Sequence, residues 1–248
     1  MTRALRLLGV TAVLALLAGL LGIGTASAGE TVPDPMSGAP AVGACYDLTY
    51  KQAGGDSTSE ATVDCSGKHT LIVGAVGQLP ESFDWDDSSE RYTYSNKICK
   101  PFWHKYYVIG KPSSYLTLLY GVWLAPTQAQ RDAGARWISC EVGIATDGVL
   151  LPLPKGGPAK ATKKPASSIA RCADARYRVT PCSKKHAWRA TYAFGVTAKG
   201  KDKAVASKLE KAAARTCPRK VSSETWLRSF RPIDENRYAI ACFSKTRR

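Results

Sequence analysis

The chain has 248 residues, of which 44% are hydrophobic and 22% charged, and its formal net charge is +15. This composition is typical of globular proteins and excludes a disordered or collagen-like chain. The length is enough for one large domain or two small ones.

The first 28 residues predict a signal peptide. Arg3 and Arg6 precede an apolar run over 7–24, and Ala26-Ser27-Ala28 supplies the small residues that signal peptidase accepts. The run is also close to the length that spans a bilayer, so an uncleaved anchor is the alternative. The glycines within the run and the Ala-x-Ala site favour cleavage after Ala28. We therefore expect a secreted, extracellular protein that associates with the cell envelope.

The cysteines all follow this segment and divide into two sets of four. An even number of cysteines in an exported chain indicates disulfides, and the absence of any CxxC pair argues against zinc-ribbon and thiol-redox sites. The second and third cysteines are 34 positions apart in one set and 35 in the other. The sets are Cys45, Cys65, Cys99 and Cys140, then Cys172, Cys182, Cys217 and Cys242.

The sequence around the cysteines also repeats. The pattern C-S-x-K-H occurs at 65–69 and at 182–186, and an arginine and an aromatic residue precede both Cys140 and Cys242. Upstream, Trp123-Leu124 parallels Trp226-Leu227. Matches in the same order indicate a tandem duplication. After a signal peptide at 1–28 and an N-terminal extension at 29–42, we predict one repeat at 43–150 and a second at 169–248.

Each repeat is predicted to be an α+β domain, with a short antiparallel sheet, one main helix and disulfide staples. In the first repeat, Ser88 or Ser89 is expected to cap a helix that reaches about Cys99 and is stopped by Pro101, which lacks a backbone donor. In the second, apolar residues at i, i+4 spacing predict a helix over 201–216. Strands are expected at 44–50, 59–65, 69–76, 115–124, 137–144, 176–180 and 186–197.

The segment between the repeats, 151–168, contains four prolines, two glycines and four lysines. Such a composition cannot bury a core and predicts a linker. The two domains are then free to reorient unless they share an interface.

In both repeats the third cysteine ends the predicted helix and the fourth lies in the last strand. This placement predicts the helix-to-sheet disulfides Cys99–Cys140 and Cys217–Cys242, and it leaves Cys45–Cys65 and Cys172–Cys182 as the other pairs. Pairing of the first cysteine with the fourth and the second with the third is the alternative. Bridges of this size would stabilise each small domain by about 2–4 kcal/mol.

These features resemble the septum-formation domain, an exported family of high-GC Gram-positive bacteria. The resemblance rests on the glycine before Cys45, on the histidine four residues after the second cysteine, on the helix cysteine and on the aromatic-led final cysteine. It covers nearly all of the mature chain as two copies, and it implies a link to cell division without a defined enzymatic activity. The glutamate that the family often has three residues after the histidine is replaced by Ile72 and Arg189.

His69 and His186 occupy equivalent places, and each is a candidate for a polar site on its repeat. The alternative, which we favour, is a ring that packs beside the disulfide and bonds a turn carbonyl. No carboxylate is matched in both repeats, because the counterpart of Asp64 is Pro181. The common hydrolase, metalloprotease and nucleotide-binding motifs are absent, so we expect no catalysis, no metal and no cofactor.

An acidic run surrounds Phe83 and Trp85. We interpret it as a solvated loop whose acids favour the N-terminus of the following helix. The alternative is a carboxylate pair of a cell-wall hydrolase. The acids are Glu81, Asp84, Asp86, Asp87 and Glu90.

Charge divides the chain unevenly. Residues 30–150 contain 9 Lys and Arg against 14 Asp and Glu, whereas residues 169–248 contain 20 against 6. A bias of this size in one half predicts an anionic partner. The candidate polyanion-binding residues are Arg171, Arg176, Arg178, Lys184, Lys185 and Arg189 near its start, and Lys208, Lys211 and Arg215 on one face of the helix.

The sequence therefore predicts a non-catalytic exported envelope protein, linked to septum formation or cell division, that binds anionic wall polymers or lipid head groups through its basic second domain. Other envelope or division proteins are further partners to consider, whereas sequence-specific binding of nucleic acid is disfavoured by export. A protein-interaction module at the septum and a wall hydrolase that uses the acids near Trp85 are the alternatives. The oligomeric state is left open.

Overall fold

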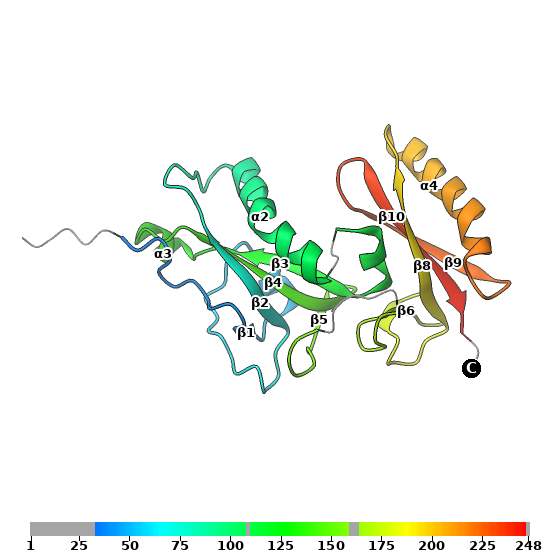
Figure 1. Cartoon of the computed structure of the whole chain (residues 1–248), viewed down its shortest axis with the longest axis horizontal. Helices are drawn as coiled ribbons and strands as arrows, with labels where there is room; N and C mark the ends of the chain where they lie inside the picture. Colours follow the sequence, from blue (N-terminus) through cyan, green and yellow to red (C-terminus); the bar gives the residue numbers. More distant parts are fainter. Residues whose placement is uncertain (1–32, 108–109, 159–163, 247–248) are drawn as a thin grey trace, which may run out of the picture. The chain divides into compact units, whose positions relative to one another are not determined.

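The computed structural model describes residues 33–107, 110–158 and 164–246, and it has α+β architecture with two antiparallel five-stranded sheets and four disulfides (Figure 1). The predicted signal peptide lies outside the described residues. Among the residues described, no helix is both long enough and apolar enough to cross a membrane.

The first sheet has the strand order β1-β2-β4-β3, and β5 pairs with β4. All pairs are antiparallel. Two short helices are each opened by a threonine in a capping box, which satisfies backbone donors at the helix start. The strands are β1 (Cys45–Tyr46), β2 (Leu71–Gln78), β3 (Leu119–Leu124), β4 (Trp137–Thr146) and β5 (Val149–Leu151), and the short helices are α1 (Tyr50–Ala53) and α3 (Gln128–Asp132).

Helix α2 (Ser88–Phe102) lies along one face of this sheet (Figure 1). The disulfide Cys99–Cys140 ties the helix to β4. Glycines let the helix side chains approach the strands closely, since a Cβ on Gly74 would lie 1.6 Å from the ring of Phe102 and one on Gly121 would lie 2.8 Å from that of Trp103.

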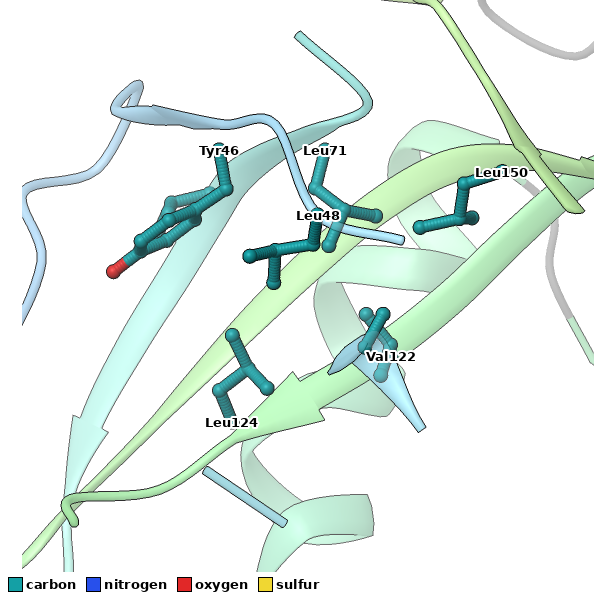
Figure 2. Packing of buried hydrophobic residues seen from close by; sticks show 8 residues of the cluster. Tyr46, Leu48, Leu71, Val122, Leu124 and Leu150 are labelled. Carbon is teal, nitrogen blue, oxygen red and sulfur yellow. The ribbon is translucent and has the colours of Figure 1, made fainter. Parts of the chain in front are cut away.

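The opposite face of the first sheet holds a second hydrophobic cluster, in which the side chains of β1, β2 and β3 converge (Figure 2). Side chains alternate along β4, so Ile138 and Cys140 face α2 while Ser139 and Glu141 face this cluster. Its labelled members are Tyr46, Leu48, Leu71, Val122, Leu124 and Leu150.

The second sheet has the order β7-β6-β8-β10-β9. Helix α4 (Asp202–Thr216) packs on it through Leu209, Ala213 and the disulfide Cys217–Cys242. The apolar spacing in the sequence correctly predicted this helix. The strands are β6 (Arg171–Ala173), β7 (Val179–Pro181), β8 (Trp188–Thr197), β9 (Trp226–Pro232) and β10 (Arg237–Lys245).

The two sheets share the order of four strands. The order β6-β8-β10-β9 repeats the order β1-β2-β4-β3. Within each of these sets of four strands, the main helix lies between the second and the third strand in the sequence. Both sheets carry a bulge beside the last cysteine: Gly74 lies between the residues paired with Cys140 and Glu141, and Thr191 lies between those paired with Cys242 and Phe243. The tryptophans do not match, because Trp123 pairs with Cys140 whereas Trp226 pairs with Ser244, two residues further along.

A 3-10 turn from the first half of the sequence covers part of the second sheet. The turn, Pro112–Leu116, places Tyr115 and Leu116 in a cluster with Trp188 and Phe243. The Tyr115 hydroxyl donates to the carbonyl oxygen of Phe230 at 3.1 Å. The two halves of the described chain therefore share an apolar contact that the sequence analysis left open.

The predicted linker over 151–168 differs from the structure at its start. Leu151 is the last residue of β5, and Leu153 is buried with Ile169 in one cluster. The backbone N–H of Leu153 donates to the carbonyl oxygen of His69 at 2.8 Å. This beginning of the segment is thus part of the first sheet and its core.

Several predicted elements were wrong in extent. Residues 59–65 form no strand, and only an isolated bridge joins Val63 to Cys45. Helix α2 continues through Pro101 to Phe102, and the backbone N–H of its C-cap, Trp103, donates to the carbonyl oxygens of Cys99 and Lys100. Residues 115–118 precede β3, and residues 176–178 form a loop before β7.

Candidate anion-binding groove

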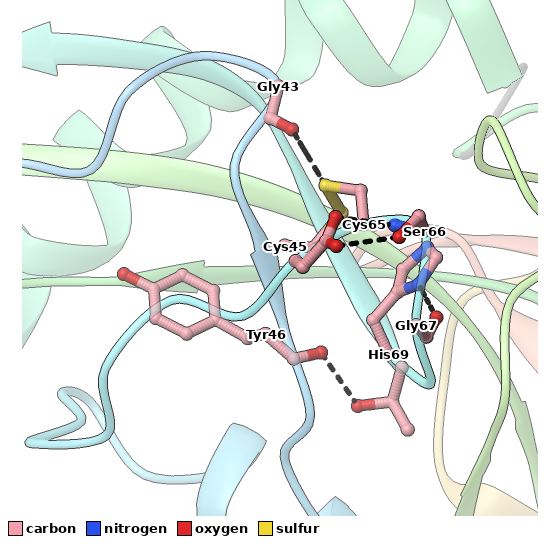
Figure 3. Close-up of a disulfide and its surroundings, with 9 residues drawn as sticks. Gly43, Cys45, Tyr46, Cys65, Ser66, Gly67 and His69 are labelled. Carbon is pink, nitrogen blue, oxygen red and sulfur yellow. Dashed lines mark hydrogen bonds between the residues drawn. A yellow bond between two sulfur atoms is a disulfide. The ribbon is translucent and has the colours of Figure 1, made fainter.

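The four predicted disulfide pairings are all present. The first bridge, Cys45–Cys65, lies next to the buried His69 (Figure 3). Nδ1 of His69 lies 3.0 Å from the carbonyl oxygen of Gly67, and its Nε2 has no hydrogen-bond partner in the described part of the chain. The ring is enclosed and cannot contact a ligand in this state.

His186 has the same relation to its disulfide. Strand pairing places both histidines three residues before the residue opposite the first cysteine, and Nδ1 of His186 lies 2.7 Å from the carbonyl oxygen of Lys184. A ring nitrogen of His186 and the sulfurs of Cys172 and Cys182 lie within 4.8 Å of one another. Because both sulfurs are bonded to each other, they offer no thiolate ligands for a metal. Unlike His69, His186 is half-buried and reaches the surface.

The surface beside His186 is a cationic hollow of about 720 Å³. It is formed by the loop between β6 and β7, the turn after Cys182, and Thr246, which follows β10. Four cations line it against a single carboxylate, Asp174. These cations are Arg176, Arg178, Lys184 and Lys185, all of them predicted from the sequence.

Asp174 organises the loop that carries two of these cations. Its carboxylate accepts from the backbone N–H groups of Arg176 and Arg178, at 2.8 and 3.0 Å, and pairs with the Arg178 guanidinium at 2.7 Å. Desolvation raises the pKa of Asp174. The hydrogen bonds from Arg178 and Arg176 lower it by more, so the pKa lies below its usual value. The negative charge inside the hollow is therefore already paired.

Two further hollows adjoin the cationic one, and we call all three together the edge groove. The middle hollow, of about 470 Å³, shares Ala187 and Thr246 with the first and is lined by Tyr177 and Trp188. The third, of about 1070 Å³, shares Lys245 and Thr246 with the middle one. Its other lining residues are mostly hydroxylated, with one more arginine and one glutamate: Arg189, Thr191, Ser222, Ser223, Glu224, Thr225 and Ser244.

The other predicted cations do not line the cationic hollow. Arg171 is half-buried against Tyr115, with its guanidinium 4.6 Å from the ring centre, and its Nε donates to the carbonyl oxygens of Tyr115 and Thr117. Burial lowers the pKa of Arg171 to about 10. Its side chain thus joins the two halves of the fold and does not line the cationic hollow, contrary to the grouping of Arg171 with the other cations in the sequence analysis. Arg189 donates to the carbonyl oxygen of Pro165 and lines the third hollow, and Lys208, Lys211 and Arg215 are exposed on α4.

The acidic run takes part in local structure. Asp87 caps α2, accepting from the backbone N–H groups of Ser89 and Glu90, and Glu90 in turn accepts from the backbone N–H of Asp84 at 2.9 Å. The prediction that Ser88 or Ser89 caps this helix is wrong, because the cap is Asp87. Phe83 and Trp85 pack edge to face within this loop.

Sequence reasoning missed the aromatic and C-terminal parts of the groove. Tyr177 lies between Arg176 and Arg178, so an aromatic residue interleaved with cations was a usable signal. Lys245 and Thr246 could not be placed, because they reach the groove only through the pairing of β10 with β8.

No family model, no curated protein and no solved structure matches this chain. What the groove binds must be inferred from its residues.

Proposed function

We propose that this protein is a non-catalytic, exported envelope protein that binds anionic wall or membrane components through its second half. The observation that carries the proposal is the cationic hollow, which is lined by four Lys and Arg side chains and by one carboxylate that is already paired with Arg178. A concave surface lined by one sign of charge concentrates counter-ions of the opposite sign. The four disulfides are typical of proteins that work outside the cell.

We further propose that the halves are tandem copies of the septum-formation domain, which links the protein to cell division. The shared strand order, the equivalent bulges and the two histidines beside equivalent disulfides support the duplication. In this interpretation the two copies have diverged, since His69 is enclosed while His186 opens onto the cationic hollow.

The test is a charge reversal in the full mature chain. The variant Lys184→Glu/Lys185→Glu should sediment with isolated cell envelopes about tenfold less at low salt, because both changes fall in the hollow. The matched control is Lys51→Glu/Lys100→Glu, which changes the net charge equally at exposed sites in the first half. Wild-type binding should weaken strongly between about 50 and 200 mM salt, as screening shortens the reach of exposed charges.

Equal losses in the two variants would show that net charge alone matters and that the hollow is not the site. Binding that salt leaves unchanged would contradict the electrostatic proposal altogether.

A further inference from the structure

The three hollows of the edge groove differ in chemistry. Cations line the first, an aromatic pair lines the middle one, and hydroxyl groups line most of the third. We propose that its ligand is a sugar polymer that carries phosphate or carboxylate groups, with one sugar ring stacked on Tyr177. The inference rests on the proposed function and names the class of anion that the second half takes.

Tyr177 combines an unusual backbone conformation with an exposed ring. Its φ is +63°, in the left-handed region that a bulky residue rarely adopts, and 64% of its surface is exposed. The loop around it is fixed by the bonds to Asp174 and by the N–H of Tyr177 itself, which donates to the carbonyl oxygen of Asp174 at 3.0 Å. Strain that the surroundings impose in this way is concentrated at functional sites.

The ring lies beside a second aromatic that supports it. The centres of Tyr177 and Trp188 are 6.3 Å apart with 33° between their planes, and Nζ of Lys245 lies 6.0 Å from the Trp188 ring. Aromatic faces carry partial negative charge and pack against the weakly positive C–H faces of sugar rings. An exposed tyrosine between cations suits a ligand in which sugar rings alternate with anionic groups.

The third hollow offers partners for sugar hydroxyls. Ser244 is the centre of a hydroxyl cluster, with Oγ 3.1 Å from the Thr191 hydroxyl and 3.4 Å from that of Ser222. A hydroxyl has one donor and two acceptor positions, so members of such a cluster can still bond a ligand. Arg189 adds a cation to the lining of the same hollow.

Two other anions fit the groove less well. Single-stranded nucleic acid stacks successive bases on several exposed rings, whereas Trp188 is only 9% exposed and Tyr177 is the one exposed large hydrophobic residue among those described after residue 164. For the same reason, few exposed apolar side chains are present that could insert into a lipid surface.

The experiment compares affinities of the full mature chain by calorimetry for five probes. Two are sugar polymers, polygalacturonate and a phosphomannan, which separate carboxylate from phosphate. The others are inorganic polyphosphate, phosphatidylglycerol vesicles and oligo-dT. The key variant is Tyr177→Gly, which removes the ring at a position whose backbone favours glycine and should therefore keep or raise the melting temperature.

Tyr177→Gly is expected to lower affinity for at least one sugar polymer by about tenfold, as the loss of one aromatic contact predicts, and to leave polyphosphate binding unchanged. Tyr177→Phe, which keeps the ring, should bind like the wild type. Tyr92→Ala is the matched control, because Tyr92 is equally exposed (65%) on α2, outside the groove.

Each contrary result has a distinct meaning. If polyphosphate or vesicles bind as tightly as both sugar polymers and Tyr177→Gly alters none of them, the sugar inference is overturned while the proposed function stands. If oligo-dT binds most tightly and depends on Tyr177, the ligand is a nucleic acid and the inference also fails. If none of the five probes binds, the proposed function itself is refuted.

Discussion

The carboxyl group of Glu141 is fully buried against the hydrophobic cluster of the first sheet. The Ser139 hydroxyl donates to its Oε1, and Oε2 has no partner among the described residues. Burial raises the pKa of Glu141 from 4.5 to about 8, so the side chain is protonated in the folded protein at neutral pH. Burial, and then the charge of Glu141, also raise the pKa of the neighbouring Tyr46.

This burial predicts a pH-dependent stability. Between about pH 4.5 and 8 the folded state holds a proton on Glu141 that the unfolded chain has lost, so the free energy of unfolding falls as pH rises through this window. The variant Glu141→Gln replaces the titrating carboxyl group with an amide that does not titrate. Its stability relative to wild type should therefore increase by up to about 1.4 kcal/mol per pH unit across the window. Urea unfolding at pH 5, 6.5 and 8 measures the difference. Glu81→Gln, at an exposed glutamate, should show no such trend.

The packing of α2 on the first sheet depends on the bulge in β2. The bulge residue, Gly74, leaves room for the ring of Phe102, and Gly77 and Gly121 give the same room to Ile98 and Trp103. The helix thus meets the sheet through large side chains on one surface and glycines on the other. This close approach brings Cys99 to Cys140, with 5.3 Å between their Cα atoms.

Gly74→Ala should therefore force the helix away from the sheet. The added methyl group would overlap the Phe102 ring, and overpacking of this kind costs about 1–3 kcal/mol of stability. Thermal unfolding followed by near-UV circular dichroism would report the loss. Gly67→Ala is the control, since the nearest atom to its Cβ is 3.4 Å away. Equal melting temperatures for the two variants would contradict the packing described for α2.

At the scale of the whole molecule, Tyr115 joins the two halves of the fold. The guanidinium groups of Arg171 and Arg231 lie 4.6 and 4.9 Å from its ring centre, and Arg231 also donates to the Ser114 hydroxyl at 2.9 Å. Desolvation lowers the pKa of both arginines. The second sheet is therefore covered on one side by a segment that precedes it by more than fifty residues.

A fragment of residues 169–248 should consequently be less stable than the same sheet in the full chain. It lacks the 3-10 turn, so the apolar side chains around Trp188 and Phe243 would be exposed and should bind a hydrophobic dye such as ANS. Urea unfolding of the fragment and of the full chain, followed by tryptophan fluorescence, measures the difference. A midpoint for the fragment equal to that of the full chain would show that the contact contributes nothing.

The sequence by itself predicted the features that follow from local pattern. The four cysteine pairs, helix α4 and the α+β class were correct, because a cysteine near the end of a helix and another in the last strand are visible in each half of the sequence. Four residues of the basic cluster, Arg176, Arg178, Lys184 and Lys185, line one hollow, because the Cys172–Cys182 bridge and the pairing of β6 with β7 hold their two turns near each other; that they bind an anion stays a prediction.

Only the tertiary structure decided the role of residues whose partners are distant in sequence. Arg171 and Arg176 look alike in a basic segment, yet Arg171 turns toward Tyr115, whose position is set by the first half of the chain. Lys245 and Thr246 reach the groove through the register of β10, and Glu141 is buried by the alternation of β4 between two packed faces. Strand register and face are fixed by contacts that local sequence does not encode, since a shift of one residue reverses every side chain.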